Sequence, residues 1–136
     1  MIGGSAENFM AKRRADILCI GIDNAAMQTR MLILEREGHK VTQARDLRQV
    51  KTACETIAFQ IAILGQSLNA SEKMRIADVV VTTCKEAKIL DLHKGYEPEF
   101  SSADAHLQVS AMEPEGLVET VNTLLETPRK KKARSQ

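Results

Sequence analysis

The chain has 136 residues, of which 43% are hydrophobic and only 3% are aromatic. This length and apolar content fit one domain with an aliphatic core. A membrane-spanning protein is excluded, because no apolar run approaches the roughly 20 residues of a span, and the first residues lack the apolar stretch of a secretory signal. We therefore expect a soluble protein of the cytoplasm.

The net charge of +1 is unevenly distributed along the chain. Residues 1–14 carry +2 and residues 128–136 carry +5, so that −6 remains on residues 15–127. We interpret residues 15–127 as the folded domain, residues 1–14 as a disordered extension and residues 128–136 as a disordered basic tail. Such a tail can bind nucleic acid or an acidic surface, but it has no aromatic residue and no DNA-binding motif beside it.

The cysteines give no sign of a cross-link or a metal site. Cys19, Cys54 and Cys84 lie 35 and 30 residues apart, and no C-x-x-C pair is present. Their odd number and wide spacing argue against a disulfide framework and against a zinc site. We expect buried, reduced thiols, no metal and no other cofactor.

Short apolar runs and amphipathic segments alternate from residue 16 onward. The run "DILCIGI" (16–22) predicts a buried strand, followed by a helix that Asn24 caps and that ends at Gly38 in a left-handed conformation. Residues 40–45 predict a second strand near an edge of the sheet. The helix expected over 46–57 has Asp46 as its N-cap and an inward stripe of Leu47, Val50, Cys54 and Ile57.

The second half of the chain repeats this alternation. A third strand is predicted over 60–65, and Ser71 begins the next helix. A fourth strand over 87–93 and a fifth over 105–112 are joined by residues 94–104, and a last helix spans 114–126 with proline in its first turn. This pattern predicts an α/β fold, in which helices cover both faces of a doubly wound parallel sheet. A dinucleotide-binding Rossmann domain is not supported, since no G-x-G-x-x-G follows the first strand.

The order of elements resembles the receiver domain of bacterial response regulators. The likeness is best at "LILEREGHKVTQARDL" (32–47), "FQIAILG" (59–65) and "EPEGLVETVNTLL" (113–125), and it covers roughly residues 15–127. It implies a five-stranded flavodoxin-like sheet of order 2-1-3-4-5. It also implies a place in two-component signal transduction, where a phosphorelay passes a phosphoryl group to the receiver.

The family's chemistry rests on residues at the carboxyl ends of the strands. Two acids after the first strand hold magnesium, and an aspartate at the end of the third strand accepts the phosphoryl group. A hydroxyl after the fourth strand and a lysine after the fifth contact that group. In this chain the matching positions are Gly21 and Ile22 with Asp23 just beyond, Gly65, His93, and Ser110 or, one residue earlier, Val109.

None of these residues can perform the role that the family assigns to its position. The resemblance therefore indicates a degenerate pocket, as in receiver-like proteins in which Gly-x-Ser ends the third strand, here Gly65-Gln66-Ser67. The alternative is a working phosphorelay receiver with an unconventional acceptor such as Ser67. A lone Asp23 would hold magnesium poorly, because that ion is usually bound by one or two carboxylates together with phosphate oxygens.

Two further features lie near the fourth strand. Asp91 and His93 share one face of it, either as an acid–base pair or, as we favour, as a hydrogen-bonded pair at its polar end. The segment that follows this strand has no helical stripe. Receivers have their fourth helix between the fourth and fifth strands, and we expect it to be missing here or reduced to one turn. The segment's residues Tyr96, Pro98 and Phe100 are then a candidate interaction surface, unless they only cover the sheet.

The sequence thus favours a stand-alone receiver-like signalling protein that is not an enzyme and acts through protein–protein contact, independently of phosphorylation. A protein partner or a second copy of the chain would be bound. The two alternatives are a phosphorelay receiver that uses Ser67 and a nucleic-acid-associated adaptor that acts through residues 128–136.

Overall fold

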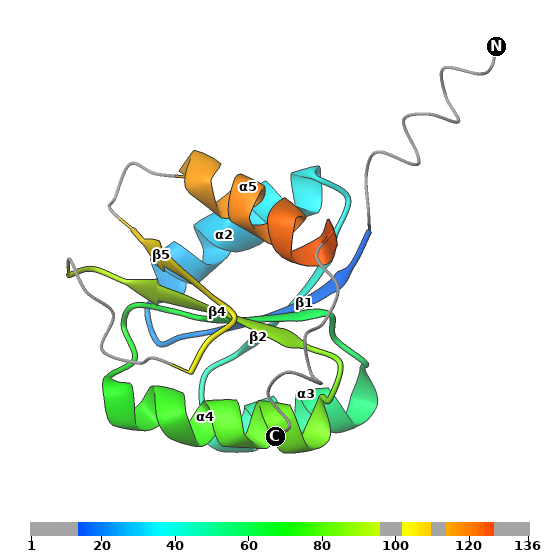
Figure 1. Cartoon of the computed structure of the whole chain (residues 1–136), viewed down its shortest axis with the longest axis vertical. Coiled ribbons are helices and arrows are strands. Elements are labelled where there is room, and N and C mark those ends of the chain that lie inside the picture. The colour runs from blue at the N-terminus through cyan, green and yellow to red at the C-terminus, as the bar shows by residue number, and fades with distance from the viewer. Residues whose placement is uncertain (1–13, 96–101, 110–113, 127–136) are drawn as a thin grey trace, which may run out of the picture.

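The computed structural model describes residues 14–95, 102–109 and 114–126. Five parallel strands form one sheet in the order β2-β1-β3-β4-β5, which confirms the predicted topology (Figure 1). The strands are β1 (Asp16–Ile20), β2 (Lys40–Ala44), β3 (Ile61–Leu64), β4 (Lys88–His93) and β5 (Ala105–Gln108).

Helices cover both faces of the sheet (Figure 1). They are α2 (Asn24–Arg36), α3 (Leu47–Thr56), α4 (Ala70–Thr83) and α5 (Pro114–Glu126). Helices α2 and α5 lie on one face and α3 and α4 on the other (Figure 1). The described residues between β4 and β5, 94–95 and 102–104, contain no helix. This agrees with the expectation that the helix which receivers have between these two strands is lost or shortened; that helix is not α4 of this structure.

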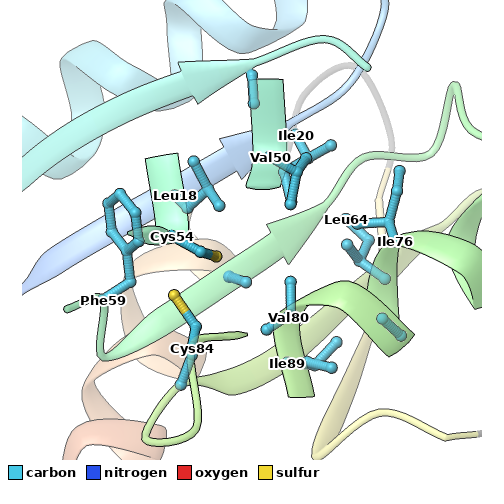
Figure 2. Close-up of a cluster of buried hydrophobic side chains, with 14 of the residues drawn as sticks. Leu18, Ile20, Val50, Cys54, Phe59, Leu64, Ile76, Val80, Cys84 and Ile89 are labelled. Carbon is cyan, nitrogen blue, oxygen red and sulfur yellow. The ribbon is translucent and has the colours of Figure 1, made fainter. Parts of the chain in front are cut away.

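The core has two parts because strand side chains alternate between the faces. Leu18 and Ile20 of β1 point toward α3 and α4, whereas Ile17 and Cys19 pack on the side of α2 and α5. Figure 2 shows the first part, where strand residues meet Val50 of α3 and aliphatic residues of α4. Each face of the sheet is therefore held by its own apolar layer, and only the ends of the strands are left for polar groups.

Two predicted helix starts were wrong by one or two residues. Asp23, not Asn24, caps α2, because its Oδ1 accepts the N–H of Ala26 at 3.2 Å. Asn69 caps α4 in place of Ser71, in a capping box with Glu72 whose two hydrogen bonds are 2.8 and 2.9 Å. In both cases another good capping side chain lies just upstream of the predicted one.

Helix α3 begins as predicted but buries a narrower face. Asp46 accepts the N–H of Gln49 at 2.9 Å and so acts as the expected N-cap. Val50 and Cys54 are buried, whereas Leu47 is 39% exposed. The first turn of α3 thus extends beyond the sheet, which is why the predicted inward stripe failed at its first position.

The three cysteines are free and buried, as predicted. Burial raises the pKa of Cys19 to about 12, against a smaller lowering by Arg30. Burial also raises the pKa of Cys54 to about 12, with a further contribution from its contact with Cys84. Figure 2 shows the sulfurs of Cys54 and Cys84 in the same apolar layer, a proximity that their separation in sequence concealed. Because a thiolate is the reactive form, these thiols are poor nucleophiles.

Gly38 provides a direct test of the turn between α2 and β2. Its φ is +96°, and a Cβ there would meet nothing closer than the side chain of Arg14 at 3.8 Å. The cost of Gly38→Ala is therefore a backbone cost, and we expect the free energy of unfolding in urea to fall by about 1 kcal/mol. Gly38→Asn at the same position is the control, because asparagine tolerates a positive φ and should cost less. An equal loss in both variants would contradict the assignment.

Candidate functional site

The carboxyl ends of β1 and β3 approach each other closely at two glycines. The N–H of Gly65 donates to the carbonyl of Ile20 at 2.8 Å. A Cβ placed on Gly65 would lie 3.0 Å from that same carbonyl oxygen and 3.6 Å from the Cα of Gly21. The backbone therefore crowds the position from which a side chain at Gly65 would begin.

The guanidinium of Arg30, from α2, fills the remaining space beside Gly65. Its Nη1 would lie 3.2 Å from a Cβ on Gly65, and its Nη2 donates to Oε1 of Gln66. Burial lowers the pKa of Arg30, while the nearby Cys19 and Asp23 act in the opposite direction. The position that the resemblance assigns to an acceptor carboxylate is thus occupied by a cation, a feature that the sequence reading missed.

Ile22, Asp23 and Ser67 form the loops around this position. The N–H of Ile22 donates to Oγ of Ser67 at 3.0 Å, which ties the loop after β1 to the loop after β3. Asp23 serves as the cap of α2. In the part of the chain that the structure describes, no three histidine, cysteine or acidic side chains are grouped to hold a metal ion.

Asp91 and His93 share a face of β4, as predicted, but they are not partners. Asp91 is fully buried, and its Oδ1 accepts a hydrogen bond from Nζ of Lys73 at 2.6 Å. Its Oδ2 lies 2.9 Å from Nδ1 of His106, because the register of β4 and β5 places His106 directly opposite. Nδ1 of His93 instead lies 2.8 Å from the carbonyl of Gly95.

Lys73 completes this network from α4. It is 4% exposed, and its ammonium also donates to the carbonyl of Leu92 at 2.8 Å. The signal was present in the sequence, since Lys73 is in helical register with Ile76, Ala77 and Val80, all of which face the core. A lysine on an inward stripe implies a buried anionic partner, and Asp91 is that partner.

Several predicted site residues are not placed. Ser110, Tyr96, Pro98 and Phe100 lie outside the described residues, so their roles stay predictions. Val109 is described, and its N–H donates to the carbonyl of His93 at 2.9 Å. That bond extends the pairing of β5 with β4 to Val109.

No protein-family model and no curated protein matches the sequence. Solved structures do match. The chemotaxis response regulator CheY4 of Vibrio cholerae has a TM-score of 0.71 at 21% identity, covering 82% of this chain and 99% of its own. A CheY-like response regulator receiver domain protein from Methanospirillum hungatei also has a TM-score of 0.71, at 22% identity and with 84% and 96% covered.

A third match is the receiver domain of the sensor histidine kinase PA1611 from Pseudomonas aeruginosa, with a TM-score of 0.71 at 11% identity. It covers 85% of this chain and 100% of its own. The chain has the receiver-domain fold. At these identities the likeness concerns the fold. That fold places Gly21, Gly65 and His93 at the same end of the sheet, where the strands have their carboxyl ends.

The buried ion pair inside this receiver fold can be tested by a double-mutant cycle. Lys73→Met leaves the Asp91 carboxylate buried with only His106, and we expect a loss of about 3 kcal/mol in the free energy of unfolding. Asp91→Leu leaves the Lys73 ammonium buried without a carboxylate and should cost a similar amount.

The double variant removes both charges, so its loss in urea denaturation should be well below the sum of the single losses. Additive losses would show that the two side chains do not depend on each other.

Proposed function

We propose that this protein is a receiver-like signalling protein that acts without phosphorylation, through contact with a protein partner. The observation that carries the proposal is the filled acceptor position. Gly65 offers no nucleophile, a side chain there would be crowded by the carbonyl of Ile20, and the guanidinium of Arg30 lies beside it. The pocket therefore lacks the carboxylate that accepts a phosphoryl group in the family, and the nearby hydroxyl of Ser67 is held by the N–H of Ile22 at 3.0 Å.

The surroundings of Gly65 also lack what a phosphoryl donor would need. The receiver domain of PA1611 holds a magnesium ion in its active-site cleft. Here Asp23 is the acid next to the corresponding loop, and its Oδ1 already accepts the N–H of Ala26. Arg30 adds a positive charge beside it, which opposes the binding of a divalent cation. We assign no catalysis to this edge.

Contact with a partner is supported by apolar residues exposed on α4. Met74 is 59% exposed and Val81 is 63% exposed, and the two lie seven residues apart, on one side of the helix. We propose that this side, together with Tyr96, Pro98 and Phe100, forms the interaction surface; a second copy of the chain is the alternative occupant.

A neighbouring structure shows response regulator TrrA in complex with histidine kinase ThkA, an example of such a contact in another protein. Among the described residues, no helix combines the length and apolar character needed to cross a membrane. We place the protein in the cytoplasm. The adaptor role of residues 128–136 has no observation in its favour and is secondary.

Incubation with acetyl phosphate and magnesium, followed by intact-mass measurement, tests the proposal. We expect no phosphoryl adduct, under conditions in which an ordinary receiver is modified. Gly65→Asp should also remain unmodified, because Arg30 would pair with the new carboxylate and the nearby acid, Asp23, is engaged as the cap of α2. An adduct on the natural chain that Ser67→Ala abolishes would establish the phosphorelay alternative.

A further inference from the structure

Arg30 is a partly buried cation without an anion. In the described part of the chain its guanidinium forms no ion pair, and its hydrogen-bond partner is the neutral amide of Gln66. Burial is the largest influence on its pKa and lowers it, and the opposing effects of Cys19 and Asp23 are smaller, so the surroundings compensate the charge only in part. A guanidinium that is taken out of water without an anion costs free energy, which binding of an anion would offset.

The loop beneath Arg30 provides further donors. Within the described residues, the N–H groups of Gln66 and Ser67 meet no acceptor. Oγ of Ser67 accepts the N–H of Ile22, so that its own hydrogen is free to be donated. Two backbone N–H groups and a hydroxyl thus lie in the loop that follows β3, and the guanidinium of Arg30 contacts the same loop. This donor set is typical of sites that bind phosphate or carboxylate oxygens.

Nearby carboxylates do not compete for these donors. Asp23 and Asp46 accept the N–H groups of their own helices, and Glu72 accepts the N–H of Asn69. A second arginine, Arg45, approaches the same edge, where it donates to Oδ1 of Asn24 and to the carbonyl of Ile22 at 3.5 Å. The edge therefore presents two guanidinium groups, although residues 15–127 as a whole are acidic.

We propose that the carboxyl ends of β1 and β3 form a non-covalent oxyanion site, in which Arg30 and the loop of residues 65–67 bind a phosphate or carboxylate group. The inference rests on the proposed function in one respect: the anion is held without transfer of a phosphoryl group. The oxyanion belongs either to a small phosphate compound or to an acidic side chain of the partner protein.

Amide NMR spectra recorded during titration with inorganic phosphate test the site, with sodium chloride keeping the ionic strength constant. We expect saturable shifts at the N–H groups of Gln66 and Ser67 and at Nε of Arg30. Arg30→Gln should weaken binding at least about tenfold, because a charge-assisted pair is lost. Arg48→Gln removes an exposed arginine of α3 and should leave binding unchanged.

The protein should remain folded without Arg30, since the variant removes a charge that burial disfavours. We expect the thermal midpoint of Arg30→Gln to be no lower than that of the natural chain. If the midpoint is lower, Arg30→Lys provides a second variant. Shifts that do not saturate, or equal binding by the Arg30 and Arg48 variants, would overturn the site.

Two further titrations identify the source of the oxyanion. Binding of phosphate and phenyl phosphate but not of acetate would indicate a phosphate compound or a phosphorylated partner. Binding of acetate with similar affinity would indicate a carboxylate side chain. The acetyl phosphate experiment separates this site from phosphoryl transfer, because a covalent adduct formed there would refute the proposed function even where oxyanion binding is observed.

Discussion

The contact between the ends of β1 and β3 constrains everything at the candidate site. The N–H of Gly65 bonds to the carbonyl of Ile20, and a Cβ on Gly65 would lie only 3.0 Å from that carbonyl oxygen, so that a side chain there would be crowded. At Gly21 the nearest group is the flexible side chain of Met27, whose Sδ would lie 3.1 Å from a Cβ and can move. With no side chain at Gly65, a long residue from α2 can extend over it, and Arg30 does so.

The sequence predicted the sheet well because the signals for strands and crossovers are local. Apolar runs of four to six residues, separated by amphipathic segments, allow few arrangements other than a parallel sheet with helices on both faces. The order of the strands came from the resemblance. Helix starts were less accurate, since Asp23 and Asn24 are both good caps and only the backbone decides which residue lies outside the helix.

Most polar contacts of the site were not predicted from the sequence, for a physical reason. Arg30 meets Gln66 across 36 positions, and Lys73 meets Asp91 across 18. Such pairs depend on the distance between elements and on the register of strands, neither of which has a local pattern. The pairing of Asp91 with His106 follows from the register of β4 and β5 alone. Even so, the lysine in the inward stripe of α4 can be recognised from the sequence, and a lysine in that place indicates a buried acid.

Two cations of this structure, Lys73 and Arg30, differ in how their charge is balanced. The Lys73 ammonium is fixed by the Asp91 carboxylate and the carbonyl of Leu92, and Arg30 is fixed over Gly65 by Gln66. The first pair is internally neutral and buried, so moving Lys73 would leave a carboxylate unpaired. Arg30 differs, because no acidic side chain among the described residues forms an ion pair with it. On the proposed function and the proposed oxyanion site, signalling at this edge depends on what Arg30 binds, rather than on a covalent change at Gly65.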